Sequence, residues 1–269
     1  MIINGLPGDL VSATDRGLLY GDGVFRTMLV RNGLIPHWPQ HYNKLQHDCA
    51  AIALDCPSLK NLTDELGQLT QPHPDGVAKI IITRGMGARG YVPPVQYQAT
   101  RILSINPSPS YPASFSSAGV KIHICNTRLG NQPRLAGVKH LNRLENVLAA
   151  SEWSDTHFSE GLLLSEDGHV IEATRSNLFL VKNDSLYTPD LTQCGVAGLQ
   201  RDRVIDWARQ RGMECKIATL HLDNLLDADE VFLVNNVIGL WPVREMTGYK
   251  RNHFPVSLLI QDWLLNGSH

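Results

Sequence analysis

The sequence predicts an α+β protein of two domains, and three observations lead to that class. Segments with strand-like and helix-like patterns intermingle without the regular strand–helix–strand rhythm of a parallel α/β sheet. Residues 106–119 contain three prolines and five serines, a composition typical of a linker. A length of 269 residues is sufficient for two cores. We therefore expect a smaller α+β domain at 1–105, an interdomain linker at 106–119 and a larger domain at 120–269.

The first domain alternates between the two kinds of element. Runs of β-branched and apolar residues predict strands at 2–3, 23–30, 77–83 and 99–105. Leucine and alanine at helical spacing predict helices at 41–54 and 59–69. The pair Asn32-Gly33 is typical of a tight turn, so we expect a second short strand after it.

The second domain shows the same mixture. The predicted strands are 120–125, 161–165, 170–181, 214–220 and 230–235, with a hairpin turn at Glu166-Asp167-Gly168. The predicted helices are 141–154, 198–211, 222–228 and 255–265. Within the first of these helices, apolar residues recur at helical spacing at Leu141, Leu144, Val147 and Leu148. We expect that apolar face to pack inward.

Composition excludes several classes of protein. Apolar residues make up 43% of the chain and the formal net charge is −2, which fits a soluble globular protein and offers no basic surface for nucleic acid. No run approaches the roughly 18 apolar residues of a membrane span. The five cysteines are odd in number and lack C-x-x-C spacing, which favours reduced thiols and a cytoplasmic location. The histidines at 37, 41 and 47 lack a completing ligand pattern, so we expect no metal.

Lys139 is the first candidate for chemistry. It lies between Gly137 and a predicted helix, at the edge of an expected core. Partial removal from water favours the neutral amine of a lysine, which is a nucleophile. Taken alone, a solvated surface lysine is the simpler interpretation.

Three further features supply what a lysine and an aldehyde cofactor would need. Glu172 is a carboxylate among strand residues, suited to a pyridine nitrogen or, more simply, to an ion pair with Arg175. The glycine-bounded loop 195–202 enters a helix, whose first N–H groups favour an anion such as phosphate. Asn235 and Asn236 come directly after a strand and can donate hydrogen bonds, although asparagines there also form turns.

Together these features form a longer pattern. From Glu172 the chain reads Glu-x-Thr-x-x-Asn-Leu-Phe, then Leu-x-Thr at 186–188 and Val-x-Gly-Leu-x-Arg at 196–201. The pattern resembles the signature of the class IV pyridoxal-phosphate aminotransferases, which include branched-chain and D-amino-acid aminotransferases. Residues 15–17 and 20–25 resemble the same family's first-domain motif. The resemblance implies a two-domain fold type IV enzyme like D-amino-acid aminotransferase, pyridoxal 5'-phosphate (PLP) in the larger domain, and a homodimer.

Within the family, residues 134–145 and 83–91 resemble the 4-amino-4-deoxychorismate lyases. The transaminases usually carry a tyrosine where this chain has Arg143. The resemblance therefore implies a PLP-dependent lyase that converts 4-amino-4-deoxychorismate to 4-aminobenzoate and pyruvate, a step of folate biosynthesis. No nucleic-acid or membrane partner is implied.

The resemblance also implies roles for individual residues. Lys139 matches the catalytic lysine that holds the cofactor as a Schiff base, and Glu172 matches the acidic partner of the ring nitrogen. The positions that match phosphate donors are Gly198, Leu199 and Asn236, with Asn235 beside them. Lys44 stands where the family usually has a phosphate-binding arginine, and a lysine lacks the bidentate fork.

The substrate carries carboxylates, so we expect arginines near it. The candidates are Arg89 and Arg128, with Arg143 and Arg26 behind them. A structural salt bridge is the alternative role for each.

Two rival functions stay open. One is a class IV aminotransferase acting on branched-chain or D-amino acids, which would use the same lysine. The other is a non-catalytic protein that keeps the fold for binding. The combination of Lys139 and Glu172 argues against the second, because a scaffold needs neither group.

Overall fold

The computed structural model describes residues 1–154 and 157–266, and it divides into two compact units. Unit 1 consists of Met1–Pro109 and Val138–Asn142, and unit 2 consists of Ser110–Gly137 and Arg143–His269. The first division falls inside the expected linker. The segment Val138–Asn142 differs from the expectation, because it packs with the first unit although it lies far along the chain.

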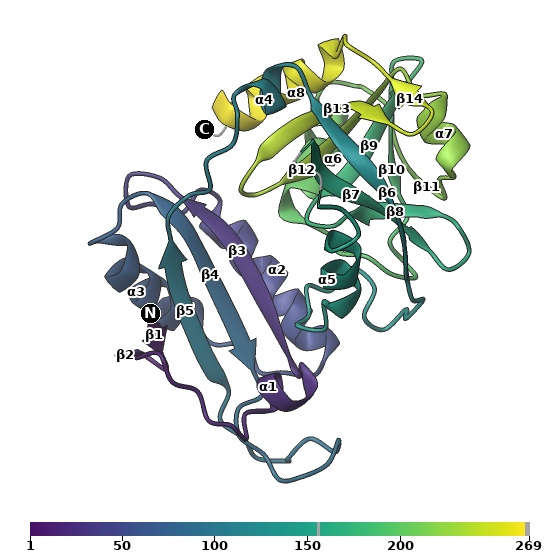
Figure 1. Ribbon diagram of the computed structural model, residues 1–269. Helices are drawn as coiled ribbons and strands as arrows, with labels where there is room; N and C mark the ends of the chain where they lie inside the picture. Colours follow the sequence, from purple (N-terminus) through teal and green to yellow (C-terminus); the bar gives the residue numbers. More distant parts are fainter. Residues whose placement is uncertain (155–156, 267–269) are drawn as a thin grey trace. The chain divides into compact units, whose positions relative to one another are not determined.

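Unit 1 is an antiparallel sheet with helices packed against it. Its strands lie in the order β2 (Leu6–Pro7), β1 (Ile2–Ile3), β5 (Thr100–Asn106), β4 (Gly76–Thr83) and β3 (Gly23–Val30). Its helices are α1 (Arg16–Tyr20), α2 (Trp38–Ala51) and α3 (Leu59–Thr70). Figure 1 shows α2 and α3 on the same face of the sheet.

The alternation of side chains along β3 and β4 explains the core of unit 1. Val24, Met28 and Val30 are buried on β3, and every second residue of β4 is buried beside them. These side chains pack against α2 and α3 in a hydrophobic cluster. The intervening residues, including Phe25 and Lys79, therefore lie on the opposite face of the sheet.

Unit 2 contains a mixed sheet. Its strands are β6 (Val120–Leu129), β7 (Phe158–Ser165), β8 (Val170–Ala173), β9 (Asn177–Lys182), β10 (Ser185–Pro189), β11 (Cys215–Ala218), β12 (Glu230–Asn235), β13 (Gly239–Met246) and β14 (Tyr249–Lys250). The order is β11-β10-β9-β12-β13-β6-β7-β8, with β14 beside β13. Three neighbouring pairs, β10–β11, β13–β6 and β6–β7, are parallel. A bridge between Val170 and Leu220 brings β8 near the other end of this order, so the sheet curls.

The helices of unit 2 are α4 (Ser114–Ser117), α5 (Leu144–Ala150), α6 (Leu199–Gln210), α7 (Leu222–Leu226) and α8 (Pro255–Asn266). α6 and α8 pack on the sheet around a cluster that includes Phe179, Trp207 and Phe232. Tyr111 and Phe115 pack edge-on against Trp241. The second half of the expected linker is therefore part of the folded unit.

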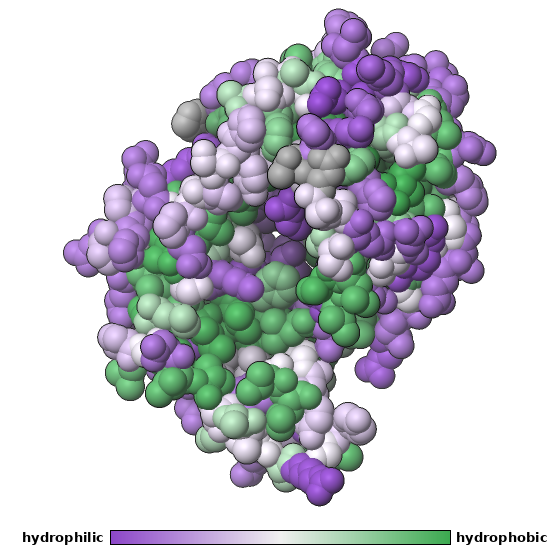
Figure 2. Space-filling model, viewed as in Figure 1, coloured by the Kyte–Doolittle hydropathy of each residue, from purple (hydrophilic) through white to green (hydrophobic). Residues whose placement is uncertain are grey.

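The predicted helix 141–154 is wrong in extent and orientation. The helix spans Leu144–Ala150, and its apolar residues Leu144, Val147 and Leu148 are 69%, 60% and 53% exposed. Figure 2 shows hydrophobic side chains gathered where Figure 1 places α5. Helical spacing identified a helix here, but not the partner of its apolar face.

Two other local predictions also need correction. Asn32 and Gly33 do form a turn with positive φ, but the chain after this turn makes only an isolated bridge, between Arg31 and Leu34, and no strand. β10 and β13 were not predicted. β10 is a run of only five residues that ends at Pro189. β13 is interrupted by Pro242, and proline is unusual inside strands.

Among the residues that the structure describes, no helix combines the length and apolar character needed to cross a bilayer.

Candidate active site

Lys139 lies in an extended segment along the edge of β3. The N–H of Phe25 donates to the Lys139 carbonyl at 2.9 Å, and the N–H of Leu141 donates to the Gly23 carbonyl at 3.0 Å. Val24 and His140 form the antiparallel bridge between these bonds. β3 is the edge strand of its sheet, so its unpaired backbone groups are available to the segment. This pairing fixes the backbone on both sides of Lys139.

The side chain of Lys139 projects over an aromatic ring. Its Nζ lies 4.6 Å from the centre of the Phe25 ring, and the Nζ of Lys79 lies 5.0 Å from the same centre. An aromatic face attracts a cationic amine and limits its access to water. Lys139 is half-buried. Unit 1 thus presents a positioned amine on the sheet face opposite α2 and α3.

Glu172 is a buried carboxylate in unit 2. It lies on β8, whose residues are all buried, and only 4% of it is exposed. Its Oε2 accepts a hydrogen bond of 2.9 Å from the N–H of Val196. That bond joins the carboxylate to the loop before α6. Unit 2 therefore holds an anionic group against the loop that the sequence singled out.

Asn177 holds the same loop by both ends of its amide. Its Nδ2 donates to the Val196 carbonyl at 2.7 Å, and its Oδ1 accepts from the Gly198 N–H at 3.0 Å. A Cβ at position 198 would lie 2.4 Å from that Oδ1, so glycine is required for the close approach. Gly198 also has no side chain to cap α6. The first N–H groups of α6 are therefore suited to an anion.

We expect Asn177→Ala to lower the free energy of unfolding by about 2 kcal/mol, because it removes two hydrogen bonds at a largely buried position. Urea unfolding monitored by circular dichroism measures the change. Asn131→Ala is the matched control, since Asn131 makes an exposed hydrogen bond and should cost about 0.5 kcal/mol or less. Equal effects of the two substitutions would contradict the role of Asn177 as a clamp.

Arg201, which belongs to the signature, and Glu160, which does not, fix the surrounding backbone. Arg201 of α6 donates to the Thr188 hydroxyl at 3.2 Å and to the Pro189 carbonyl at 3.0 Å, which ties the helix to β10. Glu160, fully buried on β7, accepts from the hydroxyls of Thr174 at 2.6 Å and Ser176 at 2.8 Å. These contacts set the turn between β8 and β9, on which Glu172 and Asn177 depend.

Asn235 and Asn236 lie at the end of β12, beside that turn. The Asn235 amide donates to the Arg175 carbonyl at 3.2 Å and to the Ser176 hydroxyl at 3.0 Å. Its Oδ1 accepts from the N–H groups of Val237 and Ile238. The Asn235 side chain therefore links the turn between β8 and β9 to the turn that follows β12. Asn236 is the half-buried residue next to it.

Arg26 and Lys44 meet in unit 1. Arg26 is 2% exposed, forms an ion pair with Asp48 of α2, and donates to the Lys44 carbonyl at 3.1 Å. It comes after Phe25 on β3, so it points to the helix-covered face while the ring faces Lys139. The structure thus separates Arg26 from Lys139. The ion pair with Asp48 is the structural salt bridge that we stated as the alternative role for Arg26.

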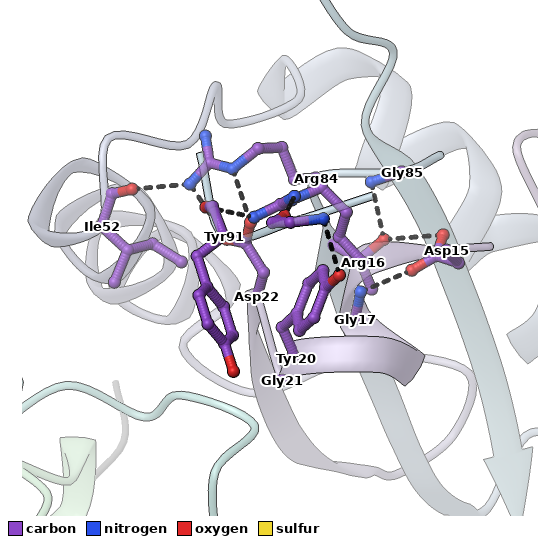
Figure 3. Close-up of polar contacts among 12 residues, drawn as sticks. Asp15, Arg16, Gly17, Tyr20, Gly21, Asp22, Ile52, Arg84, Gly85 and Tyr91 are labelled. Atoms are coloured by element: carbon purple, nitrogen blue, oxygen red, sulfur yellow. Dashed lines mark hydrogen bonds and ion pairs between the residues drawn. The ribbon is translucent and has the colours of Figure 1, made fainter. Parts of the chain in front are cut away.

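The N-terminal motif holds the loop that carries Arg89. Arg16 donates to the carbonyls of Gly90 and Tyr91 at 2.9 and 2.8 Å, and the Gly90 N–H donates to the Tyr20 hydroxyl at 3.1 Å. Figure 3 shows Arg16, Tyr20 and Tyr91 close together. Arg89 itself is exposed. Hydrogen bonds from the N-terminal motif therefore hold the loop in place immediately after Arg89.

Two arginines converge on the carboxylate of Asp22. Arg16 and Arg84 each donate to Asp22 Oδ2 at 2.8 Å, and Arg84 adds a bond of 3.0 Å to Oδ1 (Figure 3). Burial alone would raise the pKa of Asp22, but the hydrogen bonds from Arg84 and Arg16 outweigh it and lower the pKa below its usual value. Asp22 directly precedes β3, so the network fixes the strand that pairs with the Lys139 segment.

We expect Asp22→Asn to lower the free energy of unfolding at pH 7 by about 3 kcal/mol, because two nearly buried guanidiniums lose their anion. The pKa of Asp22 is lower in the folded state, so its contribution is complete above the unfolded value of about 4. The contribution is lost as the pH falls through the folded pKa. Urea unfolding of the variant and the wild type at pH 7 and in acid measures this. The difference between their free energies of unfolding should be smaller in acid. A constant difference would contradict the assignment.

Arg128 and Arg143 belong to unit 2. Arg128 lies near the end of β6, and its guanidinium donates to the Cys125 carbonyl. Arg143 is half-buried and immediately precedes α5. Unit 2 therefore contains Glu172, Gly198, Leu199, Asn235, Asn236 and these two arginines, whereas Lys139, Lys44, Arg26 and Arg89 belong to unit 1.

The α+β fold, the positioned lysine and the carboxylate–loop–helix arrangement define a class of enzyme rather than a scaffold. The family model for amino-transferase class IV matches residues 23–246. The chain therefore belongs to the class IV aminotransferase family, whose solved members share its fold.

Three relatives illustrate the range of similarity. An aminodeoxychorismate lyase of Vibrio harveyi is 36% identical, with 96% of this chain and 95% of the relative covered. The crystal structure of 4-amino-4-deoxychorismate lyase from Pseudomonas aeruginosa has a TM-score of 0.94 and 42% identity, covering 98% and 97% of the two chains. A putative branched-chain-amino-acid aminotransferase of Methanocaldococcus jannaschii is 31% identical, with coverage of 88% and 83%.

The sequence did not reveal the clamping role of Asn177 or the buried position of Glu160. Asn177 was visible as the asparagine of the signature, but its two bonds join residues about 20 positions apart in the chain. Glu160 carried no signal, since a single acid before a strand is usually exposed.

Proposed function

We propose that this chain is a PLP-dependent lyase that converts 4-amino-4-deoxychorismate to 4-aminobenzoate and pyruvate. The observation that carries the proposal is the similarity to two such lyases, at 36% and 42% identity over nearly the whole chain. Similarity at 31% to a protein described as an aminotransferase keeps amino transfer as the second candidate.

The described residues suit the cofactor. We assign the covalent link to the positioned amine of Lys139 and the partner of the ring nitrogen to the buried carboxylate of Glu172. The phosphate is assigned to the uncapped start of α6 at Gly198 and Leu199, with Asn236 and Asn235 at the end of β12. Lys44 is a further proposed phosphate ligand, supplying charge without a bidentate fork.

The reaction breaks two bonds between the substrate ring and its substituents. A proton leaves the carbon that bears the amino group, and the neighbouring enolpyruvyl C–O bond breaks, so the ring becomes aromatic. The oxygen leaves with the electrons of that bond, so the released enolate takes up a proton at its methylene carbon and becomes pyruvate, which balances the proton lost. PLP, when bound, supplies an electron sink for the carbon that loses its proton.

The chain's own residues account for the proton and for binding. The Nζ of Lys139, once released from the cofactor, accepts the proton from the ring carbon as a general base. The negative charge of Glu172 favours a protonated ring nitrogen. We assign the substrate carboxylates to Arg89, Arg128 and Arg143. Arg26 keeps its structural pairing with Asp48.

We also propose a homodimer and a cytoplasmic location. The exposed apolar face of α5, formed by Leu144, Val147 and Leu148, is the kind of surface that a second chain covers. All five cysteines are free thiols, in keeping with a reducing compartment. Sedimentation equilibrium should give about twice the chain mass of 29.8 kDa. A mass of 29.8 kDa would contradict the dimer.

The two candidate functions differ in their requirement for an amino acceptor. The lyase reaction consumes 4-amino-4-deoxychorismate alone, whereas a transaminase needs a 2-oxo acid to return the cofactor to its starting form. We expect product formation with no 2-oxo acid present and no increase when 2-oxoglutarate or a branched 2-oxo acid is added. Dependence of turnover on the 2-oxo acid would favour the aminotransferase.

A further inference from the structure

Strand β6 carries a bulge directly before Arg128, one of the arginines assigned to the substrate. From Ile124 to Arg128, β6 advances four residues, while β7 advances only two, from Leu162 to Leu164. The extra residues leave the ladder, and such a bulge bends a strand and redirects the side chains beside it. Pairing with β7 resumes at Arg128. The path of the bulge therefore decides where the Arg128 side chain points.

The carboxylate of Glu152 closes this bulge. Glu152 lies two residues after the end of α5, and it accepts hydrogen bonds from the N–H of Asn126 at 2.6 Å and from the N–H of Thr127 at 2.7 Å. The Thr127 hydroxyl donates to it at 2.5 Å. The Nε2 of His123 lies 3.4 Å from the same carboxylate. A single acid thus satisfies the backbone donors of the two residues that precede Arg128.

This carboxylate is held in place and charged. The Glu152 side chain is 15% exposed, and the ring of the next residue, Trp153, lies so close to β7 that a Cβ at Gly161 would come within 2.5 Å of it. Burial would raise the pKa of Glu152, but the hydrogen bonds from Thr127 and Asn126 outweigh it and lower the pKa to about 2. Glu152 is therefore ionised at neutral pH, and its hydrogen bonds are charge-assisted.

A second acid holds the other side of Arg128. Glu145, in the first turn of α5, accepts a hydrogen bond of 2.9 Å from the Gly130 N–H. α5 itself packs against β6 and β7. The backbone on both sides of Arg128 is therefore bound by acids from the two ends of the same helical segment.

The guanidinium of Arg128 remains available to an anion. It donates to the Cys125 carbonyl across the bulge, and the residue is exposed. Among the residues that the structure describes, no carboxylate forms an ion pair with Arg128, whereas Arg16, Arg26 and Arg84 are each paired with an aspartate. A guanidinium has five N–H donors, so one bond to a carbonyl leaves enough for bidentate contact with a carboxylate.

We propose that Glu152 is a positioning residue for Arg128, because it holds the bulge of β6 in the shape that presents the guanidinium to a carboxylate of the substrate. This role rests on the proposed function, which includes Arg128 among the arginines that bind the substrate. Glu152 acts on the reaction only through Arg128. Its loss should therefore weaken substrate binding and leave the chemical step at Lys139 unchanged.

A double-mutant cycle on the PLP-loaded enzyme tests this role. We expect Glu152→Ala to raise the KM for 4-amino-4-deoxychorismate about 10-fold, while kcat and the absorbance spectrum of bound PLP stay unchanged. In the Arg128→Ala background the same substitution should change KM by less than about 2-fold, because the guanidinium that it positions is already absent. Glu214→Ala is the control, since this exposed carboxylate pairs with Lys216 and should leave KM unchanged.

Hydrogen–deuterium exchange measured by mass spectrometry reports on the bulge without any turnover. Glu152→Ala should accelerate exchange in peptides that contain residues 126 and 127, because both N–H groups lose their acceptor. Glu152→Gln, which keeps the length of the side chain, replaces Glu152→Ala in the cycle if the alanine variant does not bind PLP. We expect its effect on KM to have the same sign.

Two results would overturn the role of Glu152. One is unchanged exchange at residues 126 and 127 in both variants. The other is a change of KM by Glu152→Ala that persists in full in the Arg128→Ala background, since a merely structural effect would add to that of Arg128. A wild-type protein that forms no 4-aminobenzoate but transfers amino groups would instead contradict the proposed function. The same cycle is then measured on the KM of the 2-oxo acid, which also carries a carboxylate.

Discussion

Lys139→Ala is expected to lower the rate of 4-aminobenzoate formation by about 1,000-fold or more, because one substitution removes both the covalent anchor and the general base. Borohydride reduction should fix PLP to Lys139 in the wild-type protein and to no residue in the variant. Absorbance of the labelled protein and mapping of the labelled peptide measure the difference.

Lys79→Ala is the matched control for this experiment. Lys79 lies over the same Phe25 ring, at 5.0 Å against 4.6 Å for Lys139. The control should therefore bind PLP covalently and keep most of its turnover. Full turnover by Lys139→Ala, or loss of the covalent cofactor in Lys79→Ala alone, would contradict the assignment of Lys139.

Glu172→Gln is expected to reduce turnover by about 100-fold or more, since the amide removes a negative charge from a buried site. The amide oxygen can still accept the hydrogen bond from the Val196 N–H, so the loop before α6 should stay in place. The effect should therefore fall on kcat, with the free energy of unfolding changed by about 1 kcal/mol or less.

Glu160→Gln separates charge at the cofactor from charge in the scaffold. Glu160 is also a buried carboxylate of unit 2, but its partners are the hydroxyls of Thr174 and Ser176 and the N–H and guanidinium of Arg175. We expect this variant to lose stability while the absorbance spectrum of bound PLP is unchanged. A spectrum that changes in Glu160→Gln and stays unchanged in Glu172→Gln would reverse the roles of the two carboxylates.

Much of the regular structure could be predicted from local pattern. The alternating run at β4 and the leucine spacing of α3 predicted both elements nearly to their ends, because each buries one face on its own unit. The segment after Lys139 could not be predicted in this way. Its leucines favoured a helix, but residues 139–141 pair with the edge of β3, and the remaining apolar face is exposed on α5. Tertiary pairing overrode local propensity there.

The functional residues divide in a similar way. Glu172 and the glycine before α6 could be found from sequence, because the signature places them at a strand and at a helix start. The clamp of Asn177 and the burial of Arg26 could not. The first depends on bonds across the turn between β8 and β9, and the second on an acid that α2 supplies. Charge alone does not distinguish a substrate arginine from a structural one.

The most direct test of the lyase assignment is the stoichiometry of products from 4-amino-4-deoxychorismate in the absence of any 2-oxo acid. The purified, PLP-loaded protein is incubated with the substrate, and 4-aminobenzoate and pyruvate are quantified together over many turnovers. The proposed function predicts equimolar release of both compounds at a steady rate, abolished by Lys139→Ala. Absence of both products, together with rapid amino transfer from a branched-chain or D-amino acid to a 2-oxo acid, would contradict it.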